Sequence, residues 1–270
     1  MPGASSSRTG KRVAALAADE IQVLAEALAA APAAPAGVHE ARKSLRRLRS
    51  LLALVRAAFG KADVQAIDDA LKTLAKGLSA LRDGQVVLDT AHHCARHAGD
   101  ADEAASWDTL TPLLVHAQEH RVAEALADDP GFMRRQAQAH RQAELLRALP
   151  WHRLHADDLR QGLDRSLRRQ QRAQDVALAS SDLDDLHDLR RKSRRLRMQL
   201  NALKRLRVSP HGAAVASRDI AALVDQLGAL QDLALLQQAL AAIEPVPHAP
   251  TWPVAARRRM ARPSPIHPLA

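Results

Sequence analysis

The chain has 270 residues, a formal net charge of +9 and an isoelectric point of about 10.6. This length can bury a sizeable core in one large or two small domains, and the excess of basic residues points to a polyanionic partner. The single cysteine, Cys94, excludes an intramolecular disulfide, and three tryptophans, two phenylalanines and no tyrosine leave mainly aliphatic residues to build the core.

Apolar residues recur with helical spacing along most of the chain, and no segment alternates as a half-buried strand would. Pro, Gly and Asp residues interrupt this pattern and set the expected helix ends. The sequence therefore predicts an all-α protein, and the Pro- and Arg-rich residues 244–270 predict a disordered basic tail. The expected helices span 10–31, 38–59, 63–98, 107–128, 131–149, 153–180, 183–207 and 212–243.

No stretch predicts a membrane span, because acidic residues interrupt the apolar segment at 13–31. Residues 1–12 are polar and then basic and contain no continuous apolar run, so no signal peptide is predicted. We therefore expect a cytoplasmic protein without a membrane partner.

The most informative feature of the sequence is a repeated basic segment. The pattern His-x-x-Arg-x-x-x-Arg-Arg-Leu-Arg runs from His39 to Arg49 and again from His187 to Arg197, and we call these segments the first and second cassettes. On a helix, most cations of each cassette form one stripe and the apolar residues lie on the opposite side. The apolar stripes are Ala41, Leu45, Leu48, Leu52, Val55 and Phe59 in the first copy and Leu189, Leu196, Leu200 and Leu203 in the second.

The cassettes carry little acidic compensation, since Glu40 and Asp188 are the only acidic residues within them. Ordinary solvated helix faces, the alternative interpretation, normally intersperse acids among the bases. Arginine binds phosphate through two parallel hydrogen bonds, and the stripe from His39 to Arg56 is about 25 Å long, enough to follow several phosphates. The candidate binding residues are His39, Arg42, Lys43, Arg46, Arg47, Arg49, Arg56, His187, Arg190, Arg191, Arg194, Arg195, Arg197 and Lys204.

Two pairs within this set have open roles. His39 and His187 either donate a hydrogen bond to phosphate or form a structural hydrogen bond at the helix start. Arg47 and Arg195 flank the stripe and are expected to reach either the ligand or an acidic partner.

A second repeated motif follows each cassette. Leu78-x-x-Leu81-Arg82-Asp83 matches Leu227-x-x-Leu230-Gln231-Asp232, which indicates a duplication with halves at about 8–128 and 129–243. Duplicated halves usually fold with pseudo-twofold symmetry, which would bring the two basic stripes face to face. Arg82, Asp83 and Asp232 are assigned a supporting role, in which the carboxylates pair with cassette arginines and orient them.

Four histidines form a possible metal site. His93 and His97 are one helical turn apart, as are His116 and His120. If the two segments pack antiparallel around a turn at 99–106, His93 lies opposite His120 and His97 opposite His116, in an arrangement that could bind zinc. Ordinary surface positions are the favoured alternative, so no metal and no cofactor is predicted.

The doubled cassette, followed each time by the Leu-x-x-Leu motif, resembles the CHAD family, the conserved histidine α-helical domain. The resemblance covers about residues 8–243. It implies two antiparallel four-helix bundles related by a pseudo-twofold axis around a basic central cavity. It also implies binding of inorganic polyphosphate and, in bacteria, association with polyphosphate granules and their other proteins.

Two departures from the family pattern are visible. The Glu-x-Glu-x-Lys motif of the triphosphate-tunnel domain that often accompanies the family is absent from the sequence, so a standalone module is expected. Gln231 stands where the first half has Arg82, so the two halves need not contribute equally.

Two other functions compete with polyphosphate binding. A binder of nucleic-acid backbones would also need basic stripes, but single-stranded recognition usually stacks bases on aromatic residues, and neither cassette contains one. An enzyme acting on phosphoanhydrides would need metal-holding carboxylates or an activated nucleophile, and neither a clustered acidic set nor a glycine-rich phosphate loop is visible. We therefore predict a binding protein that is not an enzyme.

Overall fold

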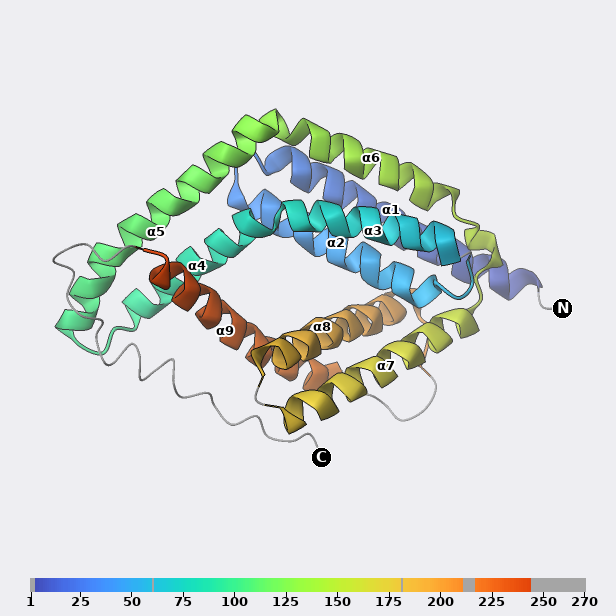
Figure 1. Cartoon of the computed structure of the whole chain (residues 1–270). Coiled ribbons are helices and arrows are strands. Elements are labelled where there is room, and N and C mark those ends of the chain that lie inside the picture. Colours follow the sequence, from blue (N-terminus) through green and yellow to red (C-terminus); the bar gives the residue numbers. More distant parts are fainter. Residues whose placement is uncertain (1–2, 60, 181, 211–216, 244–270) are drawn as a thin grey trace. The chain divides into compact units, whose positions relative to one another are not determined.

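A computed structural model of the chain describes residues 3–59, 61–180, 182–210 and 217–243 (Figure 1). The ordered elements within these ranges are all helical, which confirms the predicted all-α class. The predicted basic tail at 244–270 lies outside the described residues. The elements are α1 (Gly3–Ala30), α2 (Pro35–Val55), α3 (Lys61–Gly77), α4 (Ser79–Arg96), α5 (Ala101–Asp128), η1 (Pro130–Phe132), α6 (Met133–Ala148), η2 (Trp151–Arg153), α7 (Ala156–Ala179), α8 (Leu183–Leu206) and α9 (Ser217–Ala241).

Several of the expected helix bounds differ from the structure, and the helix expected from 10 begins at Gly3. The single helix predicted over 63–98 is two helices, α3 and α4, which are separated at the fully buried Leu78. The helix predicted from 107 begins at Ala101, because Asp100 accepts a hydrogen bond from the Glu103 amide (2.8 Å) and Glu103 accepts one from the Gly99 amide (2.7 Å). This reciprocal pair resembles a capping box and starts the helix earlier than the apolar pattern indicates.

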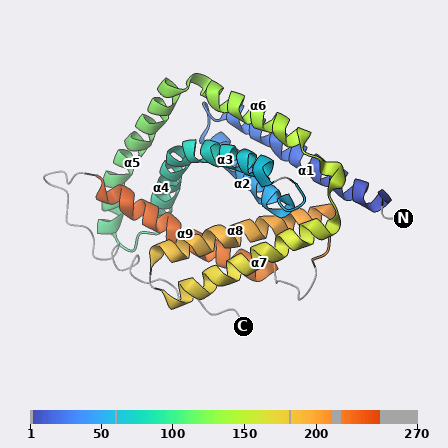
Figure 2. The ribbon, with the colours of Figure 1, turned by 45° about the vertical axis from the view of Figure 1, so that its right-hand side comes forward.

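The first compact unit comprises the described residues up to 78 and those between 129 and 225, and therefore α1, α2, α3, α6, α7, α8 and the first part of α9. The antiparallel pairs α1 with α2 and α7 with α8 lie side by side in both ribbon views (Figures 1 and 2). Gly37 allows the close approach of α2 to α1, since a Cβ there would lie 2.7 Å from the Ala27 carbonyl oxygen. The fully buried side chains of this unit include Leu24, Leu28, Leu45, Leu48, Leu71, Leu146 and Leu159.

Among the described residues, the second compact unit comprises 79–128 and 226–243, and so contains α4, α5 and the remainder of α9. Gln118 on α5 donates a hydrogen bond to the Leu81 carbonyl at the start of α4 (3.0 Å), which fixes the register of this helix pair. The core of the unit is formed by Val87, Leu88, Ala91, Trp107, Leu114, Leu236 and Leu240.

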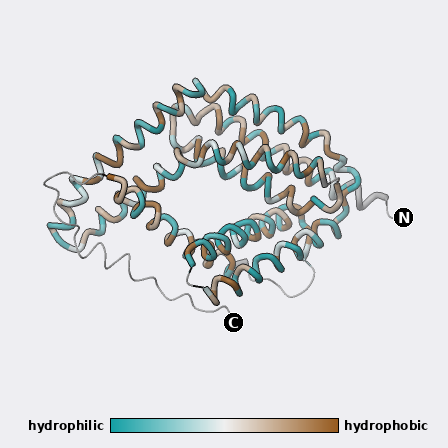
Figure 3. The backbone as a smooth tube through the Cα atoms, in the orientation of Figure 1, coloured by the Kyte–Doolittle hydropathy of each residue, from teal (hydrophilic) through white to brown (hydrophobic). Residues whose placement is uncertain are grey.

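Each unit takes segments from both predicted halves, 8–128 and 129–243, and these halves of the repeat stay a prediction. Both cassettes lie in the first unit. Hydrophilic and hydrophobic residues both recur along α7 and α8, as expected for helices with one buried side (Figure 3). Within the described ranges, no helix is long and apolar enough to cross a bilayer.

Candidate anion-binding site

The two cassettes lie on α2 and α8, and these helices pack against each other (Figure 2). At their contact, the Ser50 hydroxyl donates to the Met198 sulfur (3.5 Å) and the Gln199 side-chain amide donates to the Ser50 carbonyl (3.1 Å). Ser50 and Met198 are 148 positions apart, which is also the spacing of the two cassettes. Equivalent positions of the repeat therefore meet where α2 and α8 touch.

The predicted two-sided character of both cassette helices is confirmed. All six residues of the first apolar stripe are buried, as are Leu189, Leu196 and Leu203 of the second, whereas Leu200 is half-buried. The cations of the first cassette are all half-buried. In the second copy, His187, Arg191 and Lys204 are exposed and the remaining candidate arginines are half-buried. Both sets of candidate cations thus retain some access to solvent.

The first cassette is held by partners from α3 and from its own helix. Arg49 forms two hydrogen bonds with Asp68 of α3 (2.7 and 3.3 Å), and Arg42 donates to the Ala75 carbonyl in the last turn of α3 (2.8 Å). Glu40 accepts from Lys43 (3.0 Å), and this hydrogen bond lowers the pKa of Glu40 against the opposing effect of burial. The His39 imidazole lies 3.9 Å from the same carboxylate.

Arg47 has an acidic partner on α1. Its guanidinium lies 3.3 Å from the buried carboxylate of Glu20, which also accepts a hydrogen bond from Ser44. Arg205 of α8 lies 3.5 Å from the other oxygen of Glu20. Glu20, Arg47 and Arg205 line a cavity of about 270 Å³ between α1, α2 and α8, which we call the α1 cavity. The position flanking the first stripe therefore reaches a carboxylate, one of the two roles expected for it.

The second cassette has a similar local pair at its start and a distant partner at its end. Arg191 and Lys192 both contact the Asp188 carboxylate. Burial raises the pKa of Asp188, but the hydrogen bonds from Lys192 and Arg191 outweigh it, so the pKa is lowered. Arg197 pairs with Asp225 of α9 (2.8 Å).

A second cavity, of about 530 Å³, lies between α2, α3, α7 and α8, and we call it the α7 cavity. Its charged lining residues are Arg56, Arg195, Asp68 and two arginines of α7, Arg165 and Arg169. Burial lowers the pKa of Arg195; Asp68 opposes this shift, while the nearby Arg49, Arg169 and Arg191 add to it. Arg49 of the first cassette and Arg195 of the second thus lie near each other beside this cavity.

Several of these groups were not predicted from the sequence. Glu20, Asp68 and Asp225 come from helices outside the cassettes, so only the three-dimensional packing identifies them as partners. Arg165 and Arg169 are one helical turn apart, with the spacing of Arg42 and Arg46, and this spacing was the available signal.

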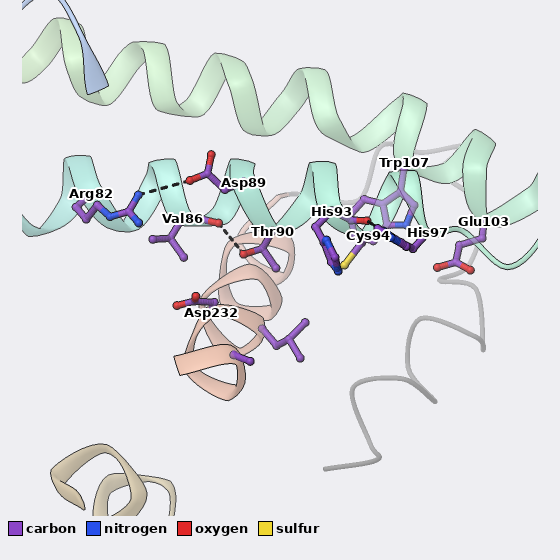
Figure 4. A pocket seen from close by; sticks show the side chains of 12 residues that line it. Arg82, Val86, Asp89, Thr90, His93, Cys94, His97, Glu103, Trp107 and Asp232 are labelled. Carbon is purple, nitrogen blue, oxygen red and sulfur yellow. Dashed lines mark hydrogen bonds and ion pairs between the residues drawn. The ribbon is translucent and has the colours of Figure 1, made fainter. Parts of the chain in front are cut away.

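Arg82, Asp83 and Asp232 lie in the second unit, so their expected pairing with cassette arginines stays a prediction. Arg82 lies 3.5 Å from Asp89 on its own helix, and both line a cavity of about 530 Å³ within this unit (Figure 4). Asp232 of α9 lines the same cavity, as do His93, Cys94, His97 and Trp107.

The predicted register of the four histidines is wrong. The contact between Gln118 and Leu81 places His116 opposite the start of α4, whereas His93 and His97 lie near its end. The His93 and His97 rings are 4.3 Å apart, and the exposed His120 lies 3.4 Å from Glu124. The early start of α5 at Ala101 causes the difference. In the part of the chain that the structure describes, no group of three or more His, Cys, Asp or Glu side chains could hold a metal ion.

A family model described as the CHAD domain matches residues 12–241. The crystal structure of the CHAD domain from the plant Ricinus communis superposes with a TM-score of 0.59 at 24% identity, covering 93% of this chain and 84% of that chain. PptA from Streptomyces chartreusis superposes with a TM-score of 0.64 at 16% identity, covering 93% and 91%. At these identities the two structures establish a shared fold alone. No curated protein sequence matches the chain.

Proposed function

The chain belongs to the CHAD domain family, and from this premise we propose that it binds inorganic polyphosphate along the cations of α2 and α8. The family is linked to polyphosphate binding in general. The observation that carries the proposal for this chain is the packing of α2 against α8, which joins two cassettes whose apolar sides are buried and whose cations keep access to solvent.

Arginine chemistry supports a phosphate chain as the ligand. Guanidinium groups stay charged in each other's company and bind phosphate oxygens bidentately. Arg42, Arg46, Arg190 and Arg194 would supply the central contacts. Arg47, Arg49 and Arg197 would be held in orientation by Glu20, Asp68 and Asp225, in the way that outer hydrogen-bonding partners orient metal ligands.

The pseudo-twofold arrangement of two four-helix bundles around a basic central cavity is part of this proposal. The contact between Ser50 and Met198 supports it for α2 and α8, because equivalent residues meet each other only near a twofold axis. The supporting roles of Arg82, Asp83 and Asp232 belong to the same proposal.

We propose a binding protein rather than an enzyme, because the cassettes provide cations without clustered carboxylates for a catalytic metal. Polyphosphate is preferred over nucleic acid because neither cassette offers an aromatic platform for bases. A place at cytoplasmic polyphosphate granules, with other granule proteins as partners, follows from this ligand.

The test is a titration of the full chain with long-chain polyphosphate. Replacing Arg46 and Arg194 together by alanine should weaken binding by about tenfold or more while the helical content persists. The matched control replaces Arg141 and Arg147, two exposed arginines of α6, and removes the same charge. Equal weakening by both double variants, or failure of polyphosphate to displace DNA or RNA at matched phosphate concentration, would contradict the proposal.

A further inference from the structure

The α7 cavity has a charge that its own residues do not balance. Its lining contains four arginines, Arg56, Arg165, Arg169 and Arg195, and one carboxylate, Asp68, which gives a formal charge of +3. Asp68 already accepts two hydrogen bonds from Arg49, which adds a further cation beside the cavity. The like-charged neighbours that lower the pKa of Arg195 are a second sign of this crowding.

One nitrogen atom of these arginines also has no hydrogen-bond acceptor among the described residues. The Nη2 atom of Arg165 is buried, and no described group of the protein accepts a hydrogen bond from it. A buried donor without an acceptor carries a desolvation cost that an anion bound beside it would remove.

We propose that the α7 cavity is a further binding site for one small phosphate anion with several charges, of the pyrophosphate class. A single carboxylate would leave most of the +3 charge unbalanced, whereas a diphosphate group matches it and offers oxygens to several guanidinium forks. The cavity also falls in the range of about 300–1,000 Å³ that is usual for small-molecule sites.

The site shares Arg56 and Arg195 with the candidate polyphosphate-binding residues. It goes beyond the proposed function because Arg165 and Arg169 belong to neither cassette and a small anion does not need the length of the stripe. The same chemistry has two sources, a free small phosphate or the terminal phosphates of a polyphosphate chain.

The first experiment measures pyrophosphate binding to the full chain by calorimetry. The Arg165→Gln and Arg169→Gln double variant should bind about tenfold more weakly or worse. The matched control is the Arg168→Gln and Arg172→Gln double variant, which removes the same charge from exposed positions of α7 outside the cavity lining and should change affinity less than about twofold. Circular dichroism checks the fold of both. Undetectable binding to the unmodified chain, or equal weakening by both variants, overturns the proposal.

Competition separates the two sources. Displacement of pyrophosphate by free-ended polyphosphate but not by chains with capped ends assigns the site to chain ends, and displacement by neither assigns it to a free phosphate. Equal displacement by both kinds of chain overturns a site for terminal or small phosphate. The Arg46→Ala and Arg194→Ala variant should keep pyrophosphate binding within about twofold, so failure of this site and failure of polyphosphate binding are distinguishable.

Discussion

The α1 cavity and the α7 cavity both lie beside α2 and α8, but their arginines have different neighbours. The 148-residue repeat relates Arg47 of the first to Arg195 of the second, and Arg205 of the first to Ala57 of the second. In the α1 cavity, the buried Glu20 pairs with both arginines. In the α7 cavity, the neighbouring helix instead supplies two further arginines. The helix packed beside a cassette therefore decides whether its flanking arginine pairs with a buried carboxylate or lies among other arginines.

The arginines of a basic chain fall into two groups, those paired with carboxylates of the protein and those available to an anion from solution. A net charge of +9 predicts a polyanionic partner, but it does not identify which cations are committed to internal ion pairs. For an arginine beside a buried carboxylate, the carboxylate replaces part of the water that would otherwise hydrate the guanidinium. An arginine beside other arginines gains most from an anion supplied by solution.

We expect the largest change in stability and in pyrophosphate binding from a substitution of Gly162, which lines the α7 cavity and lies outside the α1 cavity. A Cβ at this position would lie 2.7 Å from the Leu54 Cα and closer still to the Leu54 carbonyl oxygen, so α7 must move away from α2. Gly162→Ala should lower the free energy of unfolding by about 1–2 kcal/mol, even though Ala favours the helix, and should weaken pyrophosphate binding. Denaturant unfolding measures the first and calorimetry the second.

Gly77→Ala is the control, because among the described residues a Cβ there meets only the Arg135 side chain, at 4.0 Å. It should cost little stability and leave both cavities intact. If Gly162→Ala proves as harmless as Gly77→Ala, the close contact of α7 with α2 that shapes the α7 cavity is refuted.

The next prediction concerns Glu20, the acid that pairs with both arginines of the α1 cavity. Glu20→Gln removes the carboxylate shared by Arg47 and Arg205 and should lower the free energy of unfolding by about 1 kcal/mol, a modest value because both arginines are partly exposed. The same change should make the α1 cavity resemble the α7 cavity and give it measurable pyrophosphate binding.

Glu26→Gln on the same helix makes the same change in charge at an exposed position and should do neither. A Glu20→Gln protein that gains no pyrophosphate affinity over this control would show that neutralisation by Glu20 is not what distinguishes the two cavities.

The sequence predicts helix faces well because periodicity is a local property. The burial of Leu45 and Leu196 opposite the cassette cations follows from spacing alone. The partners of those cations do not, because Glu20, Asp68 and Asp225 come from other helices. The histidine register failed for a different reason, since the hydrogen bonds of Asp100 and Glu103 moved the start of α5 and changed which residues face α4.

We expect the smallest change in the free energy of unfolding from Asp188, a more accessible acid than Glu20. Asp188 contacts Arg191 and Lys192 as Glu20 contacts Arg47 and Arg205, but its side chain is 30% exposed against 7% for Glu20. Because the pKa of Asp188 is lowered in the folded protein, its carboxylate stabilises the fold fully above the unfolded value of 3.8, and this contribution is lost as the pH falls through the folded pKa. Asp188→Asn should therefore cost less than about 1 kcal/mol at pH 7, and the difference from the unmodified protein should vanish in acid. Urea unfolding at several pH values measures this, and a cost that grows as the pH falls would contradict the assigned ion pairs.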